Sequence, residues 1–165
     1  MGSEMCIRDR SAPTLQDIPD GTRLVLPSPN GSHLSFAAKE KTVFAGCLRN
    51  AGAVAMQAMN TVGDGTLAVV PAGERWEDGS LRPAIEDLIG AGAIISELTG
   101  SLSPEAVVAR DVFNSARPDL VARLMDSVSG VELRERGFPQ DVDIAATLNV
   151  STCAPVLLED AYIAA

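Results

Sequence analysis

The sequence predicts an α/β fold: a three-layer α/β/α domain with a mostly parallel sheet and a helical C-terminal third. Three short segments between residues 23 and 71 are apolar throughout, which is typical of strands buried on both faces of a parallel sheet. A helical pattern follows each of them, and strand–helix alternation with short connections indicates an α/β domain. From residue 103 onward, capping residues and apolar positions spaced by three and four predict consecutive helices.

Turn residues bound the predicted strands. Arg23–Leu26 follows the turn signal PDG and stops before Pro27. The second strand is Thr42–Gly46, and the third is Thr66–Pro71, which GDG precedes. We expect Pro155–Leu158 to be one last strand near the C-terminus.

A predicted helix follows each of the first three strands. The first, Ser32–Lys39, is short, and the second, Arg49–Met59, is rich in Ala and Met. The third, Pro83–Leu98, is the longest, and proline is favoured in the first turn of a helix. Ser80 lies upstream as a candidate capping residue.

The C-terminal third predicts four helices. Ser103–Glu105 combines a capping serine, a proline and an acid, which together favour a helix start. Asp119 is expected to cap the next helix, and a short helix is expected to end at Gly137. Asp141–Leu148 is the last amphipathic segment.

The composition restricts the class of partner. The 165 residues are 46% hydrophobic but only 4% aromatic, so one core is expected, built from Ala, Val, Leu and Ile. A net charge of −9 argues against nucleic acid as the main partner, yet a few arginines can bind a small anion locally. No apolar run reaches membrane-helix length, and the polar, charged first residues show no signal-peptide pattern. The three scattered cysteines suggest no disulfide framework, and this favours a cytoplasmic location. A homo-oligomer is left open.

Residues 1–10, MGSEMCIRDR, lack any hydrophobic period. They resemble the translation of a transposase adapter used in sequencing libraries. We therefore expect 1–10 to be a disordered leader and 11–165 to be the C-terminal part of a single α/β domain.

Polar residues gather where the predicted strands end, which is where open parallel sheets bind ligands. Helix N-termini and arginines suit phosphate there, and adjacent carboxylates suit Mg²⁺. The candidates at the three junctions are Asn30, Gly31 and Ser32; Cys47, Arg49 and Asn50; and Gly73, Glu74 and Arg75, with Glu86 and Asp87 in the following helix.

Each of these candidates also has a structural interpretation. Asn30-Gly31 could be a simple turn, Arg49 could cover a helix surface, and Cys47 could be a small buried side chain. Glu86 and Asp87 point about 100° apart on a helix, so only one can face a site squarely. We expect that one to be Glu86, whose longer side chain reaches further from the helix axis.

Three segments together carry a family resemblance: LVLPSPNGS, TVFAGCLRNAGAVA and VVPAGERWEDGSLRPAIEDLIGAGAII. In this order and spacing, the chain resembles 2-phosphosulfolactate phosphatase over roughly residues 13–163. That family has an α/β/α architecture and uses Mg²⁺ to hydrolyse 2-phospho-3-sulfolactate to sulfolactate in coenzyme M biosynthesis. Its members carry VDVLRAT-like and GNSP-like segments nearer the N-terminus. Neither is found in this chain, so we expect it to be the C-terminal part of a longer protein.

The resemblance implies roles for the junction residues. Glu74, Arg75 and Arg49 would be catalytic, the other junction residues would bind a small phosphorylated substrate, and Glu86 or Asp87 would hold Mg²⁺. No residue is identified as the nucleophile. Two alternatives stay open: a phosphatase for another phosphorylated hydroxy-acid, and an inactive anion-binding fragment.

Overall fold

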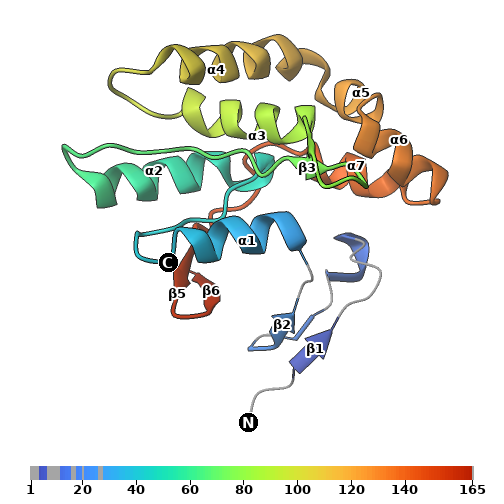
Figure 1. Ribbon diagram of the computed structural model, residues 1–165, viewed down its shortest axis with the longest axis horizontal. Coiled ribbons are helices and arrows are strands. Elements are labelled where there is room, and N and C mark those ends of the chain that lie inside the picture. Colours follow the sequence, from blue (N-terminus) through green and yellow to red (C-terminus); the bar gives the residue numbers. More distant parts are fainter. Residues whose placement is uncertain (1–3, 7–11, 16–17, 20, 26–27, 165) are drawn as a thin grey trace.

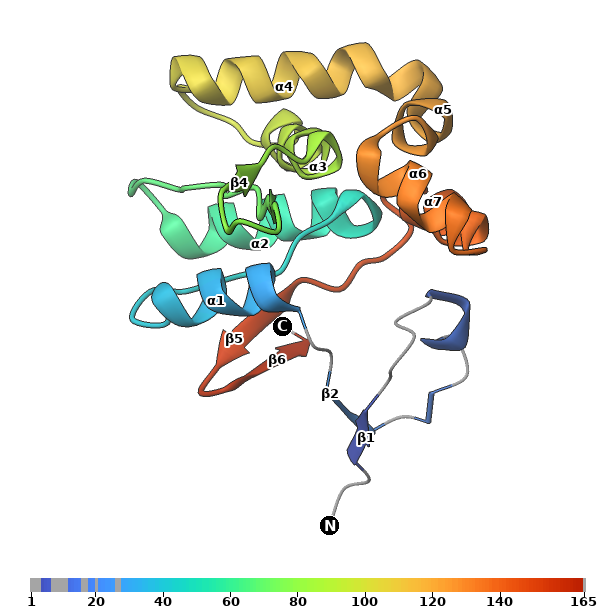
Figure 2. The same cartoon turned by 45° about the vertical axis from the view of Figure 1, so that its right-hand side comes forward.

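The computed structural model of the chain describes residues 4–6, 12–15, 18–19, 21–25 and 28–164. Helices α1 to α4 lie roughly above one another, α5 to α7 close one end, and the last two strands lie beside α1 (Figures 1 and 2). The elements up to residue 96 are β1 (Glu4–Cys6), η1 (Ala12–Leu15), β2 (Arg23–Val25), α1 (Pro29–Ala37), η2 (Leu48–Asn50), α2 (Ala51–Val62), β3 (Glu74–Arg75), β4 (Leu81–Arg82) and α3 (Ile85–Ser96).

The C-terminal third is helical, as predicted, and ends in a β-hairpin. Its elements are α4 (Pro104–Ala116), η3 (Arg117–Asp119), α5 (Leu120–Met125), α6 (Val128–Glu135), α7 (Pro139–Ala145), β5 (Pro155–Leu158) and β6 (Ala161–Ala164). The strand prediction for Pro155–Leu158 is confirmed, while its partner β6 was not predicted.

The prediction of a mostly parallel sheet is wrong for the part of the chain that the structure describes. Strands pair only in twos: β1 and β2 are parallel, whereas β3–β4 and β5–β6 are antiparallel. The α/β class holds only in the coarser sense of helices combined with small sheets. The prediction for Arg23–Leu26 is confirmed over Arg23–Val25, and Leu26 lies outside the described residues.

The second predicted strand pairs in an unexpected direction. Phe44 forms an antiparallel bridge with Val156, and the Ala45 N–H donates to the Pro155 carbonyl oxygen at 2.9 Å. The segment 42–46 is therefore extended, but it lies against the start of β5 and is not part of a parallel ladder.

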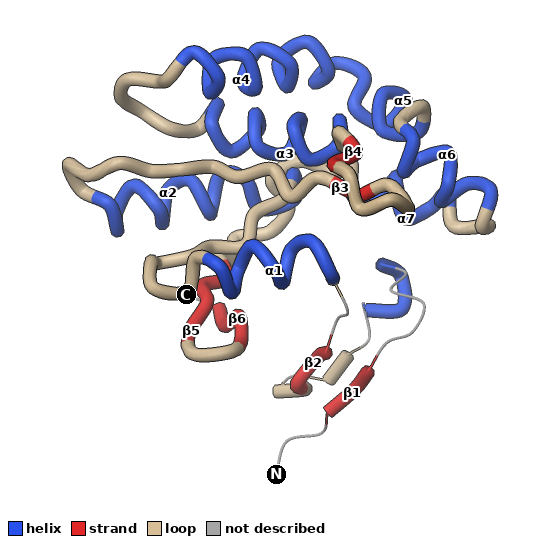
Figure 3. Tube along the Cα trace, in the orientation of Figure 1, coloured by secondary structure: helices blue, strands red, loops and turns tan. Residues whose placement is uncertain are grey.

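The third predicted strand, 66–71, has no ladder partner among the described residues. It forms part of the long loop between α2 and β3 (Figure 3), and Val70 is 65% exposed. An apolar run can adopt extended geometry by itself, but a sheet needs a neighbouring strand to accept and donate its hydrogen bonds.

Within residues 1–10, the structure describes only β1, which pairs with β2 where the sequence predicts no ordered element. The interpretation of 1–10 as a leader stays a prediction. Among the described residues, no helix combines the length and the apolar character that crossing a bilayer requires.

Helix starts follow local capping chemistry, with two corrections. Ser103 accepts the Ala106 N–H at 3.3 Å and caps α4, as predicted. Asp119 is the N-cap residue of α5, but its side chain makes no cap hydrogen bond. Ser127 caps α6, accepting the Gly130 N–H at 3.0 Å. Helix α3 begins at Ile85 and not at Pro83, its N-cap residue is Ala84, and Leu81–Arg82 form β4. Ser80 therefore does not cap it.

The core lies between α2, α3 and α4 and extends to α5 and α7. It contains small and branched aliphatic residues around one buried phenyl ring, as the composition predicts: Leu48, Ala51, Val54, Ala55, Ile89, Ala93, Ile94, Phe113, Ala116, Leu120, Leu124, Val142, Ala146 and Ala154.

Helix α3 lies close against helix α4 at Gly92. A Cβ there would lie 2.8 Å from the Cβ of Phe113 and closer still to the carbonyl oxygen of Ala109. We expect Gly92→Ala to lower the free energy of unfolding by about 1–3 kcal/mol through overpacking. Gly90→Ala is the control in the same helix: a Cβ there meets nothing within 4 Å. It should be neutral or stabilise by up to about 1 kcal/mol in urea unfolding.

Candidate active site

The charged loop after the third apolar run is a small hairpin. Glu74 pairs with Arg82, and Arg75 pairs with Leu81. The turn closes through the Trp76 N–H, which donates to the Ser80 carbonyl oxygen at 2.9 Å. Only two residues of each strand pair, so the hairpin depends on contacts with the rest of the molecule for its position.

The turn of the hairpin is stabilised by its own side chains. Asp78 Oδ1 accepts the Ser80 hydroxyl at 2.6 Å and the Ser80 N–H at 2.9 Å, and these bonds lower the pKa of Asp78. Gly79 has a φ of +82°, in the left-handed region that favours glycine. The Asp78-Gly79-Ser80 sequence therefore forms the turn, and the carboxylate of Asp78 is occupied by its hydrogen bonds to Ser80.

Helix α1 brings the first junction to this hairpin. Asn30 Nδ2 donates to Glu74 Oε2 at 2.8 Å, across 44 positions of the sequence. Pro29 occupies the first turn of α1, and Ser28 forms no side-chain cap hydrogen bond there. The N-terminus of α1 therefore lies beside Glu74, with its positive dipole end uncapped by that serine.

Helix α3 brings Asp87 to the same place. Asp87 Oδ2 accepts the Gly73 N–H at 2.8 Å. Gly73 has a φ of +68°, so a side chain at this position would be strained. The hydrogen bond from the Gly73 N–H holds the carboxylate of Asp87 beside the start of β3, where Glu74 lies.

The residues that make these contacts line one hollow of about 510 Å³, which we call the site hollow. It brings six predicted residues together from the first and third junctions and from α3. Its lining residues are Ser28, Asn30, Gly31, Ala72, Gly73, Glu74, Arg75 and Asp87.

Arg75 is the cation of the site hollow. Its Nη1 donates to the Gly79 carbonyl oxygen at 2.8 Å, which holds the exposed side chain against the turn. A guanidinium has five N–H donors, and this bond uses one of them. The remaining donors suit the oxygens of phosphate, sulfonate or carboxylate.

Burial is the main cause that raises the pKa of Asp87. The negative charges of Glu86 and Glu74 raise it further, while the Gly73 N–H lowers it. Two carboxylates that line one hollow and repel each other are a suitable pair for a cation.

The two carboxylates fit Mg²⁺. Among the described residues, no group of three or more His, Cys, Asp or Glu side chains could hold a metal ion. Mg²⁺ commonly takes only one or two protein carboxylates and fills its remaining positions with water and substrate phosphate. Glu74 and Asp87 supply that number of hard oxygen ligands at the site hollow.

The structure reverses the expected roles of Glu86 and Asp87: Asp87, and not Glu86, faces the site hollow. Glu86 Oε1 accepts the hydroxyl of Ser129 on α6, and Glu86 does not line the site hollow. The two acids diverge, as adjacent helical positions must, but Asp87 is the one that bonds Gly73 and lines the site hollow.

The second junction is not part of the site hollow. Arg49 Nη1 donates to the Ile144 carbonyl oxygen at 2.8 Å and to Thr147 Oγ1 at 2.7 Å. Its guanidinium thus ties η2 to the end of α7. Junctions share one sheet edge only when their strands are parallel, and the segment 42–46 lies antiparallel to β5.

Asn50 serves as a structural bridge. It is 7% exposed, and its Nδ2 donates to the carbonyl oxygens of Ala45 at 3.2 Å and Cys153 at 3.1 Å. Its Oδ1 accepts the Cys47 N–H at 2.8 Å. These three bonds satisfy a buried amide, so neither Asn50 nor the exposed Cys47 is placed to bind substrate at the site hollow.

Ser32 and Gly31 have different outcomes. Gly31 lines the site hollow. Ser32 lies one residue further along α1, where its Oγ donates to the Ser28 carbonyl oxygen at 2.5 Å. The Ser32 side chain therefore turns back along its own helix and is not part of the site.

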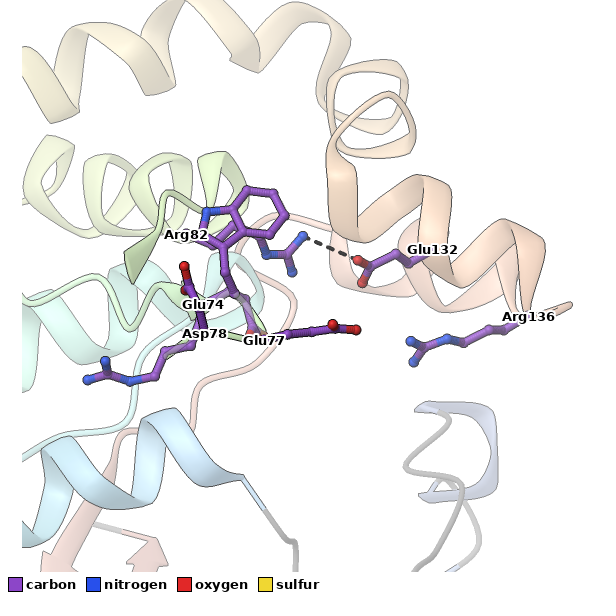
Figure 4. A pocket seen from close by; sticks show the side chains of 8 residues that line it. Glu74, Glu77, Asp78, Arg82, Glu132 and Arg136 are labelled. Carbon is purple, nitrogen blue, oxygen red and sulfur yellow. Dashed lines mark hydrogen bonds and ion pairs between the residues drawn. The ribbon is translucent and has the colours of Figure 1, made fainter. Parts of the chain in front are cut away.

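Sequence reasoning missed a second, larger hollow that shares Glu74 and Arg75 with the first. It has a volume of about 750 Å³ and is also lined by Trp76, Glu77, Asp78, Arg82, Glu132 and Arg136 (Figure 4). Glu77 and Arg136 point toward one another across it (Figure 4). Glu132 lies on α6, and Arg136 directly follows that helix. Glu132 is 50 positions after Arg82, so no local motif could identify it as a lining residue.

The raised pKa of Asp87 predicts a pH-dependent effect on stability. A raised pKa means that the folded protein binds this proton more tightly than the unfolded chain does. The contribution is therefore fully present below the ordinary pKa of 3.8 and is lost as the pH rises through the folded value. Ionisation of Asp87 thus lowers the stability of the fold relative to its protonated form.

We expect Asp87→Asn to raise the melting temperature at pH 7, since an amide oxygen can still accept the Gly73 N–H. The gain should shrink as the pH falls through the raised pKa of Asp87 in the folded protein and should vanish below the ordinary pKa of 3.8, where the wild-type carboxyl is neutral in both states. Thermal unfolding from pH 3 to 8 measures this difference. A variant less stable than the wild type at pH 7 would contradict the expectation.

Comparison with known proteins shows the family of the chain. The family model for 2-phosphosulpholactate phosphatase matches residues 12–160. A probable 2-phosphosulfolactate phosphatase of Pseudothermotoga lettingae is 30% identical over 141 residues, covering 85% of this chain and 59% of that relative. A protein of the same name from Gloeobacter violaceus is 28% identical over 136 residues, covering 82% of this chain and 55% of its own length.

The chain therefore spans a little over half the length of these curated relatives. The family match extends across both hollows, from β2 and α1 through the hairpin to α6 and β5. On this evidence, the chain belongs to the 2-phosphosulfolactate phosphatase family.

Proposed function

We propose that the full-length protein is a Mg²⁺-dependent phosphatase that hydrolyses 2-phospho-3-sulfolactate to sulfolactate and phosphate, a reaction of the coenzyme M biosynthesis type. Family membership supports the reaction class. The observation that carries the proposal is the convergence on one hollow of the α1 N-terminus, Arg75 and two carboxylates.

The anion-binding groups of this chain are Arg75 and the N-terminus of α1. Phosphate ester cleavage requires neutralisation of the charge on the phosphoryl oxygens. Backbone N–H groups at a helix N-terminus suit those oxygens, and the forked guanidinium of Arg75 suits a tetrahedral anion. A substrate with phosphate, sulfonate and carboxylate groups needs such cations even in a protein of net charge −9.

Glu74 and Asp87 would hold the metal. When bound, Mg²⁺ supplies further charge neutralisation and Lewis acidity at the phosphoryl group. The residues around these two acids orient them: Asn30 donates to Glu74, and the Gly73 N–H donates to Asp87. Hydrogen bonds of this kind keep a carboxylate aimed at its cation.

We further propose a cytoplasmic location. Cys47 and Cys153 are both free thiols in the structure, which suits a reducing compartment.

Phosphate release tests the proposal directly. The full-length protein and this chain should each be assayed with Mg²⁺ and 2-phospho-3-sulfolactate, beside 2-phospholactate and 2-phosphoglycerate. We expect release from the sulfonated substrate to be fastest and to stop with EDTA. Faster turnover of an unsulfonated ester would favour a phosphatase for another phosphorylated hydroxy-acid. Activity confined to the full-length protein would make this chain an anion-binding fragment.

A further inference from the structure

We propose that Arg82 is a positioning residue, which fixes Glu74 at the site hollow by fastening the β3–β4 hairpin to helix α6. The inference rests on the proposed function in one respect, namely that Glu74 acts in turnover. Arg82 itself does not line the site hollow, and the proposal gives it no contact with substrate.

Arg82 is buried and bonded on three sides. The residue is 8% exposed, and its Nη1 lies 3.3 Å from Glu132 Oε1 (Figure 4). Its Nη2 donates to Ser129 Oγ at 3.5 Å, and its guanidinium carbon lies 5.6 Å from the centroid of the Trp76 ring. One side chain of β4 thus joins the hairpin turn to two residues of α6.

The same strand pair connects Arg82 to Glu74. The two residues are directly opposite in the β3–β4 register, and cross-strand partners point to the same side of a sheet. A hairpin with four paired residues and an exposed turn has little stability of its own. The position of Glu74 therefore depends on what holds β4, and Arg82 is the buried anchor of β4.

Through Ser129, helix α6 also contacts helix α3, which carries the second carboxylate of the site, Asp87. The Ser129 hydroxyl donates to Glu86, while its oxygen accepts from Arg82. One donor and one acceptor role are both available to a hydroxyl group. Glu86 lies next to Asp87 in the first turn of α3, so α6 braces both elements that carry the carboxylates of the site.

The geometry requires an arginine. Ion pairs with exposed partners contribute little, and the Glu132 side chain is 44% exposed. The contribution of Arg82 comes from one planar group that bonds Glu132 and Ser129 while it stacks on Trp76. Lysine can supply the charge but cannot make the two bonds and the stacking contact at once.

The first test uses Trp76 as a reporter, because it is the single tryptophan of the chain. We expect Arg82→Ala to increase acrylamide quenching of Trp76 fluorescence and to lower its anisotropy, at a temperature where circular dichroism shows the fold intact. Arg110→Ala is the matched control: Arg110 pairs with Asp111 on α4 at 3.2 Å, away from the hairpin. Unchanged Trp76 fluorescence in Arg82→Ala would overturn the inference.

The second test links the hairpin to turnover in the full-length protein. Arg82→Ala should lower kcat by about 10- to 100-fold, as expected for a misplaced catalytic group, and Arg82→Lys should recover only part of it. If Arg82→Ala fails to fold, Ser129→Ala provides the milder change. It should give a smaller loss of the same kind.

A double-mutant cycle distinguishes positioning from general destabilisation. Asn30 also holds Glu74, so the combined effect of Arg82→Ala and Asn30→Ala on kcat should be smaller than the product of the single effects. Arg110→Ala combined with Asn30→Ala should give the simple product. Independent effects of Arg82 and Asn30 would overturn the inference. A wild-type protein that releases no phosphate would instead overturn the proposed function, whatever the fluorescence shows.

Discussion

Asp87→Asn is expected to abolish the proposed Mg²⁺-dependent phosphatase activity, whereas Glu86→Gln should keep the wild-type metal dependence. Asp87 lines the site hollow together with Glu74, and among the described residues these two are the carboxylates that line it. Removing one of them halves the protein charge available to a cation that already takes few protein ligands. Glu86 instead accepts a hydrogen bond from Ser129, which an amide oxygen can also accept.

Mg²⁺ titration of phosphate release measures the difference. Glu74→Gln should behave like Asp87→Asn, and Glu86→Gln should show at most a small loss of stability, because it weakens the first-turn charge of α3. If Glu86→Gln loses metal dependence and Asp87→Asn keeps it, our assignment of the two acids is wrong. If all three variants keep it, the metal is held elsewhere in the full-length protein.

Arg75→Ala should lower kcat/KM by about 10- to 150-fold. A charge-assisted hydrogen bond to an anion contributes roughly 1.5–3 kcal/mol once water is excluded by the bound substrate. Arg75 lines both hollows and has guanidinium donors beyond the bond to Gly79. Arg75→Lys should recover only part of the activity, because lysine lacks the forked geometry.

Arg49→Ala is the contrasting variant. It removes the bonds to Ile144 and Thr147, so we expect a loss of about 1–2 kcal/mol in unfolding free energy with near-normal kinetics of the folded enzyme. Steady-state kinetics and urea unfolding of both variants separate the two roles. Equal kinetic losses would mean that Arg49 also reaches the substrate.

The helices were largely readable from the sequence. The periodicity of α2, α3 and α4 and the capping serine of α4 are local properties, because helix hydrogen bonds join residues four positions apart. Strand partners are not local. The segment 42–46 is extended as predicted, yet Phe44 in it pairs with Val156, which lies more than a hundred positions later in the sequence. An apolar run indicates extended geometry but does not identify its partner.

The candidate site shows the same division. Motif and junction reasoning named Asn30, Gly73, Glu74 and Arg75 from their residue types, and all four line the site hollow. It also established that Glu86 and Asp87 must diverge, because that follows from helix geometry alone. Which of the two faces the site depends on how α3 is rotated against the hairpin and α6.

Only the tertiary structure decided the roles that depend on distant partners. Arg49 bonds a carbonyl 95 positions away, and Arg82 pairs with Glu132 across 50 positions. An arginine in a sequence specifies its charge and its donors but not the oxygen that they reach. Packing of the helices placed the partner of Arg49 at the end of α7 and that of Arg82 on α6, and left Arg75 facing the hollow.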